Sequence, residues 1–376
     1  MSKKSISSSR GFFAVILIPG ILVISPVKAN LNRPWYRYED STENHARRQE
    51  ACQKSQNVRI LFYNVENLYD PFDDTTKLDN EFTPDGGKHW NYDRFFTKLQ
   101  HLAKVFIAAG GWEPPAIIGM CEVENRFVLR KLVSETPLKK YGYRILHYDS
   151  PDARGVDVAM IYRPDIFSCA EAKQVPVRFP FDSAAATRDI LMVKGSLPGG
   201  DTLFLFINHW PSRRGGYEAT KGKRNFTGRL LRSKTDSLFR KDTRCRIIIM
   251  GDLNDEPDKE SIRVHLGARC DTAGLKSCEL VNLMCTGRKN FPGTIKYQGQ
   301  WSVFDQFIVS GSLLDPEARY HTSPGDARIF AEPFLLEADD RYSGSRIRRT
   351  YTGPAYKGGF SDHLPVILDL TVMQVK

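Results

Sequence analysis

The sequence has no cysteine pair spaced as Cys-x-x-Cys, although it contains seven cysteines. Structural zinc sites usually carry such pairs, so nothing indicates a thiolate zinc site. The chain also shows no internal repeat and no low-complexity segment, so neither a repeat protein nor a compositionally biased chain is indicated. A metal site in this protein must therefore be sought among carboxylates, amides and imidazoles.

Long apolar runs are scarce as well. The run from Phe12 to Ile24 is broken by a proline and a glycine, and it is short for a spanning helix, which needs about 20 apolar residues. Basic residues precede it, and Val27-Lys28-Ala29 follows with small residues suited to a cleavage site. We predict that residues 1–29 are a cleaved secretory signal, with no membrane span left after cleavage. An uncleaved anchor is the alternative, and the absence of a cysteine at the cut disfavours a lipoprotein.

The predicted mature chain is positively charged. The whole sequence carries +10, and residues 1–29 hold four basic and no acidic residues, which leaves +6 (10 minus 4). A polyanionic partner such as nucleic acid would suit this charge, and ordinary solubility explains it equally well. The remaining 347 residues (376 minus 29) can form one large domain, and we expect a monomer that is periplasmic or extracellular.

The odd number of cysteines leaves at least one free. Cys270, Cys278 and Cys285 are close in sequence, and a disulfide among them can form in an oxidising compartment. Cys121 lies in an apolar stretch, so we interpret it as a small core residue.

Residues 30–57 are polar and are predicted to form an N-terminal arm, with the folded domain at residues 58–376. Strands are predicted at 58–63, 116–121, 143–148, 156–162, 189–197, 202–208, 246–250, 301–309 and 364–370. Helices are predicted at 92–108, 126–134, 218–240 and near 258–266. Residues 311–358 read as a long, irregular, arginine-rich connection. Runs of strands separated by occasional helices predict two packed sheets covered by helices.

Polar clusters follow several of these strands. Asn64 and Glu66 lie two positions apart after the first strand, where period-2 geometry puts them on one face; a turn cap is the structural alternative. Glu122 follows the buried strand 116–121, where an unpaired carboxylate would be costly. A cation or a basic partner must compensate it, and carboxylate ligands suit Mg²⁺ or Ca²⁺.

Asn208 and His209 end the strand 202–208, and a basic loop with Arg213 follows. This grouping could attract a phosphate and donate a proton to it, although a lone histidine is more often structural. Asp252 and Asn254 end the strand 246–250.

The glycine before Asp252 allows close backbone approach. Asp252 and Asn254 are predicted to share one face of an extended segment, where they can orient an attacking water and bind a phosphoryl oxygen. The structural alternative is an Asx turn, which suits Asp255 better than Asp252.

Asp305 lies inside the apolar strand 301–309 and needs a partner. The triplet Ser361-Asp362-His363 opens the last strand, and His363 is the natural partner, because a carboxylate fixes the tautomer and raises the basicity of an imidazole. Asp362 is then free to face a metal or its bound water.

Taken together and in this order, the clusters resemble those of the endonuclease/exonuclease/phosphatase superfamily, whose members include DNase I-like nucleases, and we expect a secreted bacterial member. The resemblance covers residues 58–372. It implies an α/β, four-layered sandwich of two packed mixed β-sheets flanked by helices. Long segments at 70–91 and 311–358 and the basic loop at Arg213 depart from the family pattern and would shape the substrate site.

The resemblance also implies roles for single residues. Glu122 is similar to the main Mg²⁺ ligand, with Asn64, Glu66 and Asp362 beside it, and Mn²⁺ or Ca²⁺ are alternatives. His363 is similar to the catalytic imidazole, held by Asp305, and His209 to a second one. The pair that positions water and the scissile phosphate is Asp252 and Asn254, and Asn208 and Arg213 would add phosphate contacts.

The implied reaction is metal-dependent in-line hydrolysis of a phosphodiester. We expect a secreted endonuclease that acts on DNA or RNA, with Trp210 and Trp301 able to stack on bases if exposed. His209 and the predicted export disfavour abasic-site repair. A phosphodiesterase or phosphatase for phospholipid head groups or sugar and inositol phosphates is the second hypothesis, and no obvious hydrophobic hairpin supports lipid. A non-catalytic binding module is the third.

Overall fold

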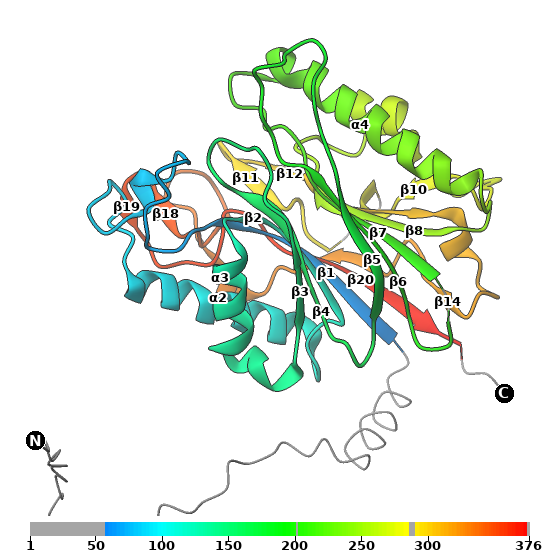
Figure 1. Cartoon of the computed structure of the whole chain (residues 1–376), viewed down its shortest axis with the longest axis horizontal. Coiled ribbons are helices and arrows are strands. Elements are labelled where there is room, and N and C mark those ends of the chain that lie inside the picture. The colour runs from blue at the N-terminus through cyan, green and yellow to red at the C-terminus, as the bar shows by residue number, and fades with distance from the viewer. Residues whose placement is uncertain (1–56, 201, 286–289, 374–376) are drawn as a thin grey trace, which may run out of the picture. The chain divides into compact units, whose positions relative to one another are not determined.

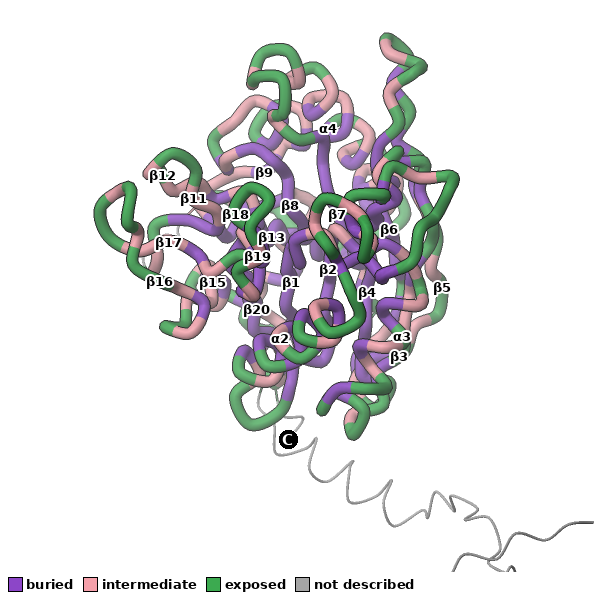
Figure 2. Tube along the Cα trace, turned by 90° about the vertical axis from the view of Figure 1, so that its left-hand side faces the viewer, coloured by how far each residue is buried: buried purple, intermediate pink, exposed green. Residues whose placement is uncertain are grey.

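The computed structural model describes residues 57–200, 202–285 and 290–373. Within them, two seven-stranded sheets pack face to face, and helices cover the outer face of each sheet (Figure 1). Buried residues concentrate on the central strands and exposed ones on the surrounding loops (Figure 2). The predicted four-layered α/β sandwich of two mixed sheets is therefore confirmed. The predicted signal at 1–29 and nearly all of the arm at 30–57 lie outside the described residues.

The first sheet, called sheet A here, has the order β14-β20-β1-β2-β4-β3, with β15 also paired to β20. Its strands are β1 (Asn57–Leu68), β2 (Ile117–Val123), β3 (Arg144–His147), β4 (Asp157–Tyr162), β14 (Tyr320–His321), β15 (Ala327–Ile329) and β20 (Val366–Val372). Sheet B has the order β5-β6-β7-β8-β13-β10-β9. Its strands are β5 (Ser168–Val175), β6 (Ile190–Ser196), β7 (Thr202–His209), β8 (Arg246–Asp252), β9 (Ala268–Arg269), β10 (Leu280–Asn282) and β13 (Asp305–Ser310).

Each sheet has a parallel pair at its centre, flanked by antiparallel strands. In sheet A the pair is β1 and β2, and in sheet B it is β7 and β8. β20 and β13 run antiparallel beside β1 and β8, respectively. Because parallel strands end at the same edge, the carboxyl ends of four central strands and the starts of two neighbours gather at one end of the sandwich.

In the described residues, three α-helices form the outer layers, and two of them begin at a capping side chain. α2 (Tyr92–Gly110) begins where the Asn91 side chain accepts the Arg94 amide, and α3 (Arg126–Ser134) begins at Asn125, which caps in the same way. Both lie against sheet A. α4 (Tyr217–Phe239) covers sheet B together with the short η3 (Ser261–Leu266). In the described part of the chain, no helix is long and apolar enough to cross a membrane.

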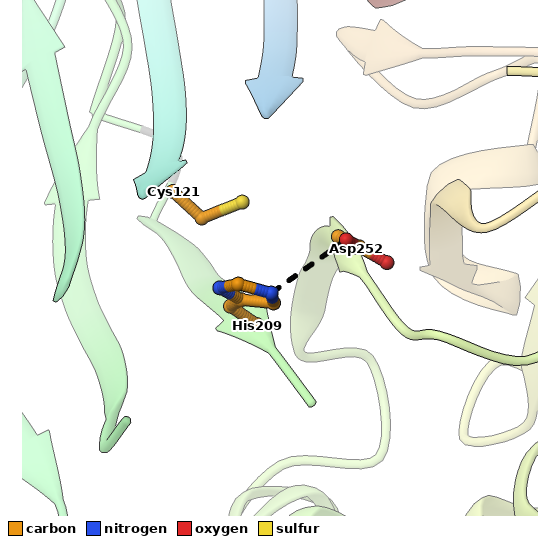
Figure 3. Close-up of side chains that lie close together, drawn as sticks. All are labelled: Cys121, His209 and Asp252. Atoms are coloured by element: carbon orange, nitrogen blue, oxygen red, sulfur yellow. Dashed lines mark ion pairs between the residues drawn. The ribbon is translucent and has the colours of Figure 1, made fainter. Parts of the chain in front are cut away.

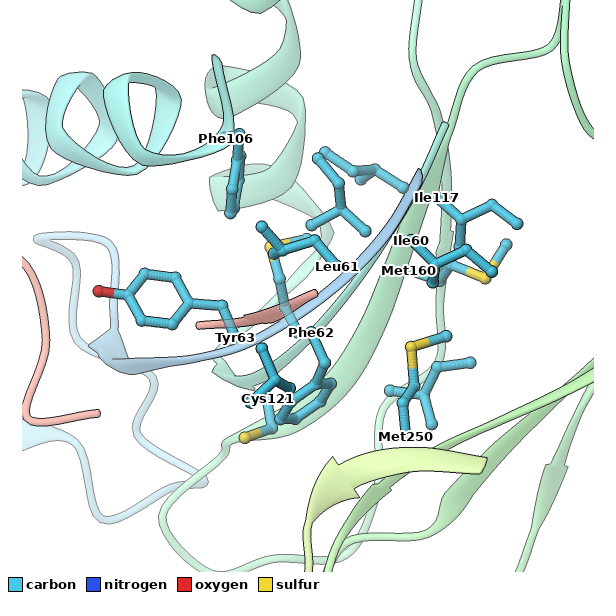
Figure 4. Packing of buried hydrophobic residues seen from close by; sticks show 14 of the residues in the cluster. Ile60, Leu61, Phe62, Tyr63, Phe106, Ile117, Cys121, Met160 and Met250 are labelled. Atoms are coloured by element: carbon cyan, nitrogen blue, oxygen red, sulfur yellow. The ribbon is translucent and has the colours of Figure 1, made fainter. Parts of the chain in front are cut away.

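The main core fills the space between the sheets and beneath α2. Figure 4 shows Tyr63 and Phe106 packing from β1 and α2 on one side, while Met250 of β8 faces Ile60 and Met160 from the other. Tyr63 and Phe106 meet edge to face at 6.5 Å between ring centroids. A second cluster lies between sheet B and α4 and includes Leu231.

The predicted helices and most predicted strands are present, with two kinds of difference. β5 was not predicted, because as an edge strand its side chains are largely exposed and show no apolar alternation. The segment predicted as irregular, 311–358, instead contains η6 (Gly311–Leu314), β14, β15, η7 (Pro333–Leu335), β16 (Leu336–Ala338), β17 (Ser345–Ile347), β18 (Tyr351–Thr352) and β19 (Ala355–Tyr356). These pieces are too short to leave a periodic signal.

The remaining short elements connect the layers. They are η1 (Asn80–Phe82), η2 (Pro137–Tyr141), η4 (Leu283–Cys285), β11 (Ile295–Tyr297) and β12 (Gln300–Ser302). The predicted strand 301–309 is divided between β12 and β13, so Asp305 is the first residue of a strand and does not lie inside one. Cys270 and Cys285 form a disulfide next to β9 and η4, which agrees with a bridge among the three neighbouring cysteines.

Candidate active site

Asp252, at the end of β8, is the centre of the polar cluster. One carboxylate oxygen, Oδ2, accepts a hydrogen bond from the Asn64 side chain at 3.1 Å. The same oxygen lies 3.6 Å from Nε2 of His209 and 3.8 Å from Nε2 of His363. These two distances are too long for hydrogen bonds, but they place both imidazoles beside one carboxylate. Burial and the nearby Asp305 carboxylate raise the pKa of Asp252 to about 6.

His363 is held by a buried carboxylate. Its Nδ1 lies 2.7 Å from Oδ2 of Asp305, and Asp305 is fully buried. Burial alone lowers the pKa of His363, but the carboxylates of Asp305 and Asp252 outweigh it and raise the pKa well above its usual value. Ser361 fixes the approach, because its hydroxyl donates to the Asn64 carbonyl and accepts from the His363 amide. The predicted pairing of Asp305 with His363 is present.

His209 has the opposite electrostatic surroundings. Burial, together with the cations of Arg188 and Arg154, lowers its pKa well below the usual value. Its Nδ1 is buried and has no hydrogen-bond partner among the described residues. His209 is therefore a neutral imidazole at neutral pH, while His363 favours the protonated form.

The thiol of Cys121 lies in the same space. Figure 3 shows Cys121 at the end of β2 beside His209, which is directed at Asp252, and the ligand atoms of these three residues lie within 4.8 Å of one another. Burial raises the pKa of this thiol, so it stays neutral. Cys121 is fully buried, as predicted for a core residue.

The carboxylates of sheet A surround the other side of the site. Glu122, at the end of β2, accepts the Asn67 amide at 3.0 Å, and its other oxygen lies 4.0 Å from Nε2 of His209. Glu66 and Asp362 are both bound by Arg349 at 2.9 Å. Burial, followed by repulsion from Asp362, raises the pKa of Glu66. Burial is also the main cause of the raised pKa of Glu122.

This donor set fits a divalent cation. Buried carboxylates that repel one another have raised pKa values unless a positive charge compensates them. Carboxylate and amide oxygens are the ligands preferred by Mg²⁺, Mn²⁺ and Ca²⁺. Glu122 fits best, because only one of its oxygens is hydrogen-bonded within the described part of the chain. Glu66 and Asp362 already share Arg349, which would have to move if both bound the ion.

Several site residues have the left-handed backbone conformation, which period-2 reasoning could not foresee. The φ angles are +49° at Glu66, +56° at Asn67, +63° at Glu122 and +49° at Asn254. The pairing register of β1 shifts between Asn64 and Leu68, and that of β2 shifts between Cys121 and Val123. The prediction that Asp252 and Asn254 share one face of an extended segment was therefore wrong, because the strand ends at Asp252.

The turn geometry also corrects a second expectation. Asp252 accepts the Asn254 amide at 2.9 Å, and Asn64 accepts the Glu66 amide at 3.0 Å, so both act as Asx caps as well as site residues. Asp255 was expected to suit that role better than Asp252. It is instead fully buried and bound by Arg213, Arg224 and Ser261.

Two predicted phosphate contacts gain no support from the geometry. The Asn208 amide is fully buried, donates to the carbonyls of Phe206 and Met250, and accepts from the Trp210 indole. Arg213 is committed to Asp255 and to the Asn254 carbonyl. The expectation that Trp210 could stack on a base was wrong, because only 1 % of it is exposed.

Trp301 is partly buried against Phe291 at 4.9 Å between ring centroids. It is therefore mainly a packing residue.

Besides Arg349, three cations near the site were not anticipated. Arg154 is the positive group that most favours the charged form of Glu122, and Arg188 is buried and binds Asp152 and the Trp210 carbonyl. Lys98 of α2 is buried beneath Thr350, and burial lowers its pKa to about 8. Of these three cations, only Lys98 could have been found from the sequence, because it is a basic residue within the apolar face of a predicted helix.

A sequence model of the Endonuclease/Exonuclease/phosphatase family matches residues 59–372. The chain belongs to this family. The predicted family is confirmed, and membership supports hydrolysis of phosphoester bonds with a divalent metal site of the kind that the carboxylates and imidazoles could form. No curated protein sequence matches the chain.

Solved structures with the same fold agree with this assignment. A humanised D. rerio TDP2 with 14 mutations has a TM-score of 0.52 at 13 % identity, covering 85 % of this chain and 100 % of that chain. TDP2 from C. elegans has 0.51 at 14 %, covering 89 % and 82 %. A family protein from Bacteroides thetaiotaomicron has 0.50 at 17 %, covering 85 % and 98 %. At such identities the likeness shows the fold alone, which confirms the DNase I-like sandwich.

Proposed function

We propose that this protein is an Mg²⁺-dependent phosphodiesterase that acts on nucleic acid, most simply as a secreted endonuclease. The observation that carries the proposal is the convergence of Asp252, His209 and a His363–Asp305 pair beside the half-buried Glu122. An acid, a base and a cation site within a few ångströms are what phosphodiester hydrolysis requires.

The side chains divide the work as follows. The protonated His363 donates hydrogen bonds or a proton to a phosphoryl oxygen, and Asp305 keeps it oriented. Asp252, with a pKa of about 6, is suited to accept a proton from an attacking water near neutral pH. The neutral His209 carries a single N–H. It can donate a hydrogen bond to a phosphoryl oxygen from Nε2 when that nitrogen carries the proton and Nδ1 does not. A metal held by Glu122, with Asn64, Glu66 and Asp362 beside it, would stabilise negative charge on the phosphoryl oxygens.

Nucleic acid is supported by charge and by a relative. The predicted mature chain carries +6 (10 minus 4), which favours polyanions. A D. rerio TDP2 structure with this fold was solved in complex with a single-strand DNA product, at a TM-score of 0.50 and 12 % identity.

The test is turnover by purified mature protein with Mg²⁺, Mn²⁺ or Ca²⁺, or with EDTA. The substrates are plasmid DNA, single-stranded RNA, bis-p-nitrophenyl phosphate and a phospholipid panel, with His363→Ala in parallel. Divalent-dependent cleavage of DNA or RNA that disappears in the variant supports the proposal. Absence of any cleavage by a folded protein overturns it.

Phospholipid head groups are the second candidate, because one observation favours them. The loop after β1 exposes Phe72 (59 %) and Leu78 (70 %) close to the catalytic end of the sandwich. Apolar side chains of this kind can enter a lipid surface. Turnover of the lipid panel without nucleic acid cleavage would select this candidate.

Export is proposed together with the activity. The Cys270–Cys285 disulfide supports it, since disulfides persist mainly in oxidising compartments. N-terminal sequencing of protein recovered from the periplasm and the medium tests this part. A chain that begins near residue 30 supports cleavage, and an intact membrane-bound chain would indicate the uncleaved anchor.

A further inference from the structure

A pocket of about 210 Å³ opens beside the carboxylate cluster. It lies between the loop that carries η1 and the hairpin of β18 and β19. These two segments are far apart in the sequence but lie side by side in the fold (Figure 1). The lining residues are Glu66, Asn67, Phe82, Lys88, Arg349, Thr350, Tyr351 and Gly353. Neither the proton-transfer groups nor Glu122 belongs to this lining.

The pocket is nevertheless next to the reaction centre. Asn67 lines the pocket, and its backbone amide holds Glu122 at 3.0 Å. Glu66 also lines it and is two residues from Asn64, which binds Asp252. A group in the pocket would therefore belong to the part of the substrate adjacent to the scissile phosphate.

Its walls are packed against each other. The Phe82 ring stacks on Tyr69 at 4.4 Å between centroids and meets Tyr351 edge to face at 6.3 Å. The Tyr351 hydroxyl donates to the Lys88 carbonyl at 2.9 Å, which ties the two loops together. A pocket whose walls are packed in this way is preformed, and binding pays little ordering entropy.

The lining side chains carry two positive charges and one negative charge. The negative one, Glu66, is fully occupied, since Arg349 and the Thr350 amide bind its two oxygens. Arg349 also binds Asp362 at 2.9 Å, and 46 % of its side chain stays exposed for a further partner. Among the described residues, the ammonium group of Lys88 makes one hydrogen bond, to the Gly353 carbonyl at 3.0 Å, and it lies 4.0 Å from the exposed Glu81 and 5.1 Å from the centroid of the Tyr351 ring. The pocket thus presents an ammonium and a guanidinium to whatever enters it.

We propose that this pocket binds a second phosphoryl group of the substrate, next to the scissile one, through Lys88 and Arg349. This inference rests on the proposed phosphodiesterase function. Guanidinium and ammonium groups form strong charge-assisted hydrogen bonds with phosphate oxygens. The neighbouring phosphate of a nucleic acid strand and the ring phosphate of an inositol lipid share this chemistry, and the experiment separates these sources.

The experiment compares substrates that differ by one phosphomonoester. The nucleotide set is TpT, pTpT and TpTp, and the inositol set is glycerophosphoinositol with and without a 4-phosphate. We expect the added phosphate to raise kcat/KM about tenfold in one set, as one charge-assisted contact would give. Gain in the nucleotide set identifies a nucleic acid, and gain in the inositol set identifies a phosphoinositide.

The variants assign the gain to the pocket. In Lys88→Gln the ratio between the paired substrates should fall toward one, and Lys88→Arg should restore most of it. Lys139→Gln removes the same charge from an exposed position on η2 at the opposite end of sheet A and should keep the full ratio. Circular dichroism confirms that each variant is folded. The kcat/KM ratios between paired substrates are also measured on the unmodified protein, so the phosphate preference itself can be tested even if a variant fails to fold.

Two failures are distinguishable. If the protein cleaves TpT but gains nothing from any added phosphate, the pocket proposal is wrong and the proposed function stands. If no diester is cleaved, the proposed function fails. Calorimetric titration of the protein with pTpT and with TpT, both in EDTA, then tests the pocket proposal without turnover. Equal affinities for the two ligands would overturn the proposal. Tighter binding of pTpT that is lost in Lys88→Gln would uphold it.

Discussion

The two sheets share a strand pattern but bring different chemistry to the same place. Each has a central parallel pair and an antiparallel neighbour whose first residues enter the site. Sheet A ends in carboxylates and amides, Asn64, Glu66 and Glu122, which suit a cation. Sheet B ends in His209 and Asp252, which suit proton transfer. Similar backbones thus position unlike groups, and the chemistry is decided by the few residues at the strand ends.

The pair of His363 and Asp305 crosses this division, as does the hydrogen bond from Asn64 to Asp252. His363 precedes β20 of sheet A, and its partner Asp305 begins β13 of sheet B. These two strands hold equivalent places in their sheets, so the pair joins the halves of the site. If the comparison is right, metal affinity and proton transfer should be separable by mutation, whereas the end of the sandwich opposite the site should affect neither.

The largest effect is expected for Glu122→Gln on the sheet A side. Loss of the charge that favours the cation should lower kcat/KM by about 10⁴-fold, since several kcal/mol of transition-state stabilisation depend on it. Calorimetric Mg²⁺ affinity should fall in parallel. Unchanged Mg²⁺ binding in a folded variant would show that Glu122 is not the main ligand.

On the sheet B side and at the bridging pair, His209→Ala and His363→Ala should each lower kcat by about 10³-fold, the usual range for general acid–base groups. Neither should change Mg²⁺ affinity more than slightly, in contrast to Glu122→Gln. Asp305→Asn should reproduce most of the His363→Ala loss, because the imidazole loses its fixed tautomer. The division of labour fails if a histidine variant loses metal binding as completely as it loses turnover.

A smaller effect is expected from Arg154→Gln, which removes a cation that faces Glu122. Because a guanidinium beside the cation site would also attract the substrate phosphate, we expect its loss to raise KM about tenfold, as for one charge-assisted contact, with kcat changed less. Arg154→Lys, which keeps the charge, is the matched control. A fall in kcat at constant KM would assign Arg154 to the transition state and not to substrate binding.

The smallest effect on turnover is expected at the far end of sheet A, in Asp369→Asn. Asp369 of β20 binds Arg59 at 2.6 Å and Arg328 at 2.9 Å. Its loss should lower the free energy of unfolding by about 2 kcal/mol and leave kcat/KM within error. A large loss of activity at full stability would contradict a purely structural role.

The same variant has a defined pH dependence. Burial opposes ionisation, but the two arginines outweigh it and lower the pKa of Asp369. A lowered carboxyl pKa contributes stability that is complete above the unfolded value of about 3.9 and is lost as the pH falls through the folded value. Denaturant unfolding should therefore separate the wild type from Asp369→Asn at pH 7 and bring them together in strong acid.

Much of this architecture could be predicted because its signals are local. The apolar face of α2, with Phe95, Leu99 and Leu102, and the buried runs of β1, β2 and β8 give clear periods. The polar clusters stand out because carboxylates directly follow apolar strands. Gly251 was expected to allow close approach, and a Cβ there would indeed lie 2.5 Å from the Asn208 carbonyl oxygen.

What sequence could not give depends on non-local contacts. In the sequence, the Asn208 amide looked like a phosphate ligand because it ends an apolar strand beside a basic loop. Only the structure shows that three buried groups already bind it. The roles of Arg154, Arg188 and Lys98 depend on segments that meet only in the folded chain. The hairpin of β18 and β19 has two-residue strands, which no period can reveal, although it forms one wall of the pocket.

The left-handed conformation of Glu66 and Glu122 has a consequence for reading related sequences. A glutamate at such φ angles costs about 1–2 kcal/mol relative to glycine, which adopts them freely. Drift without selection for catalysis should therefore replace these two residues with glycine or asparagine early and leave the core intact. A relative that keeps both glutamates has been held there by the reaction, so these two positions offer a marker that separates active enzymes from descendants that retain only the fold.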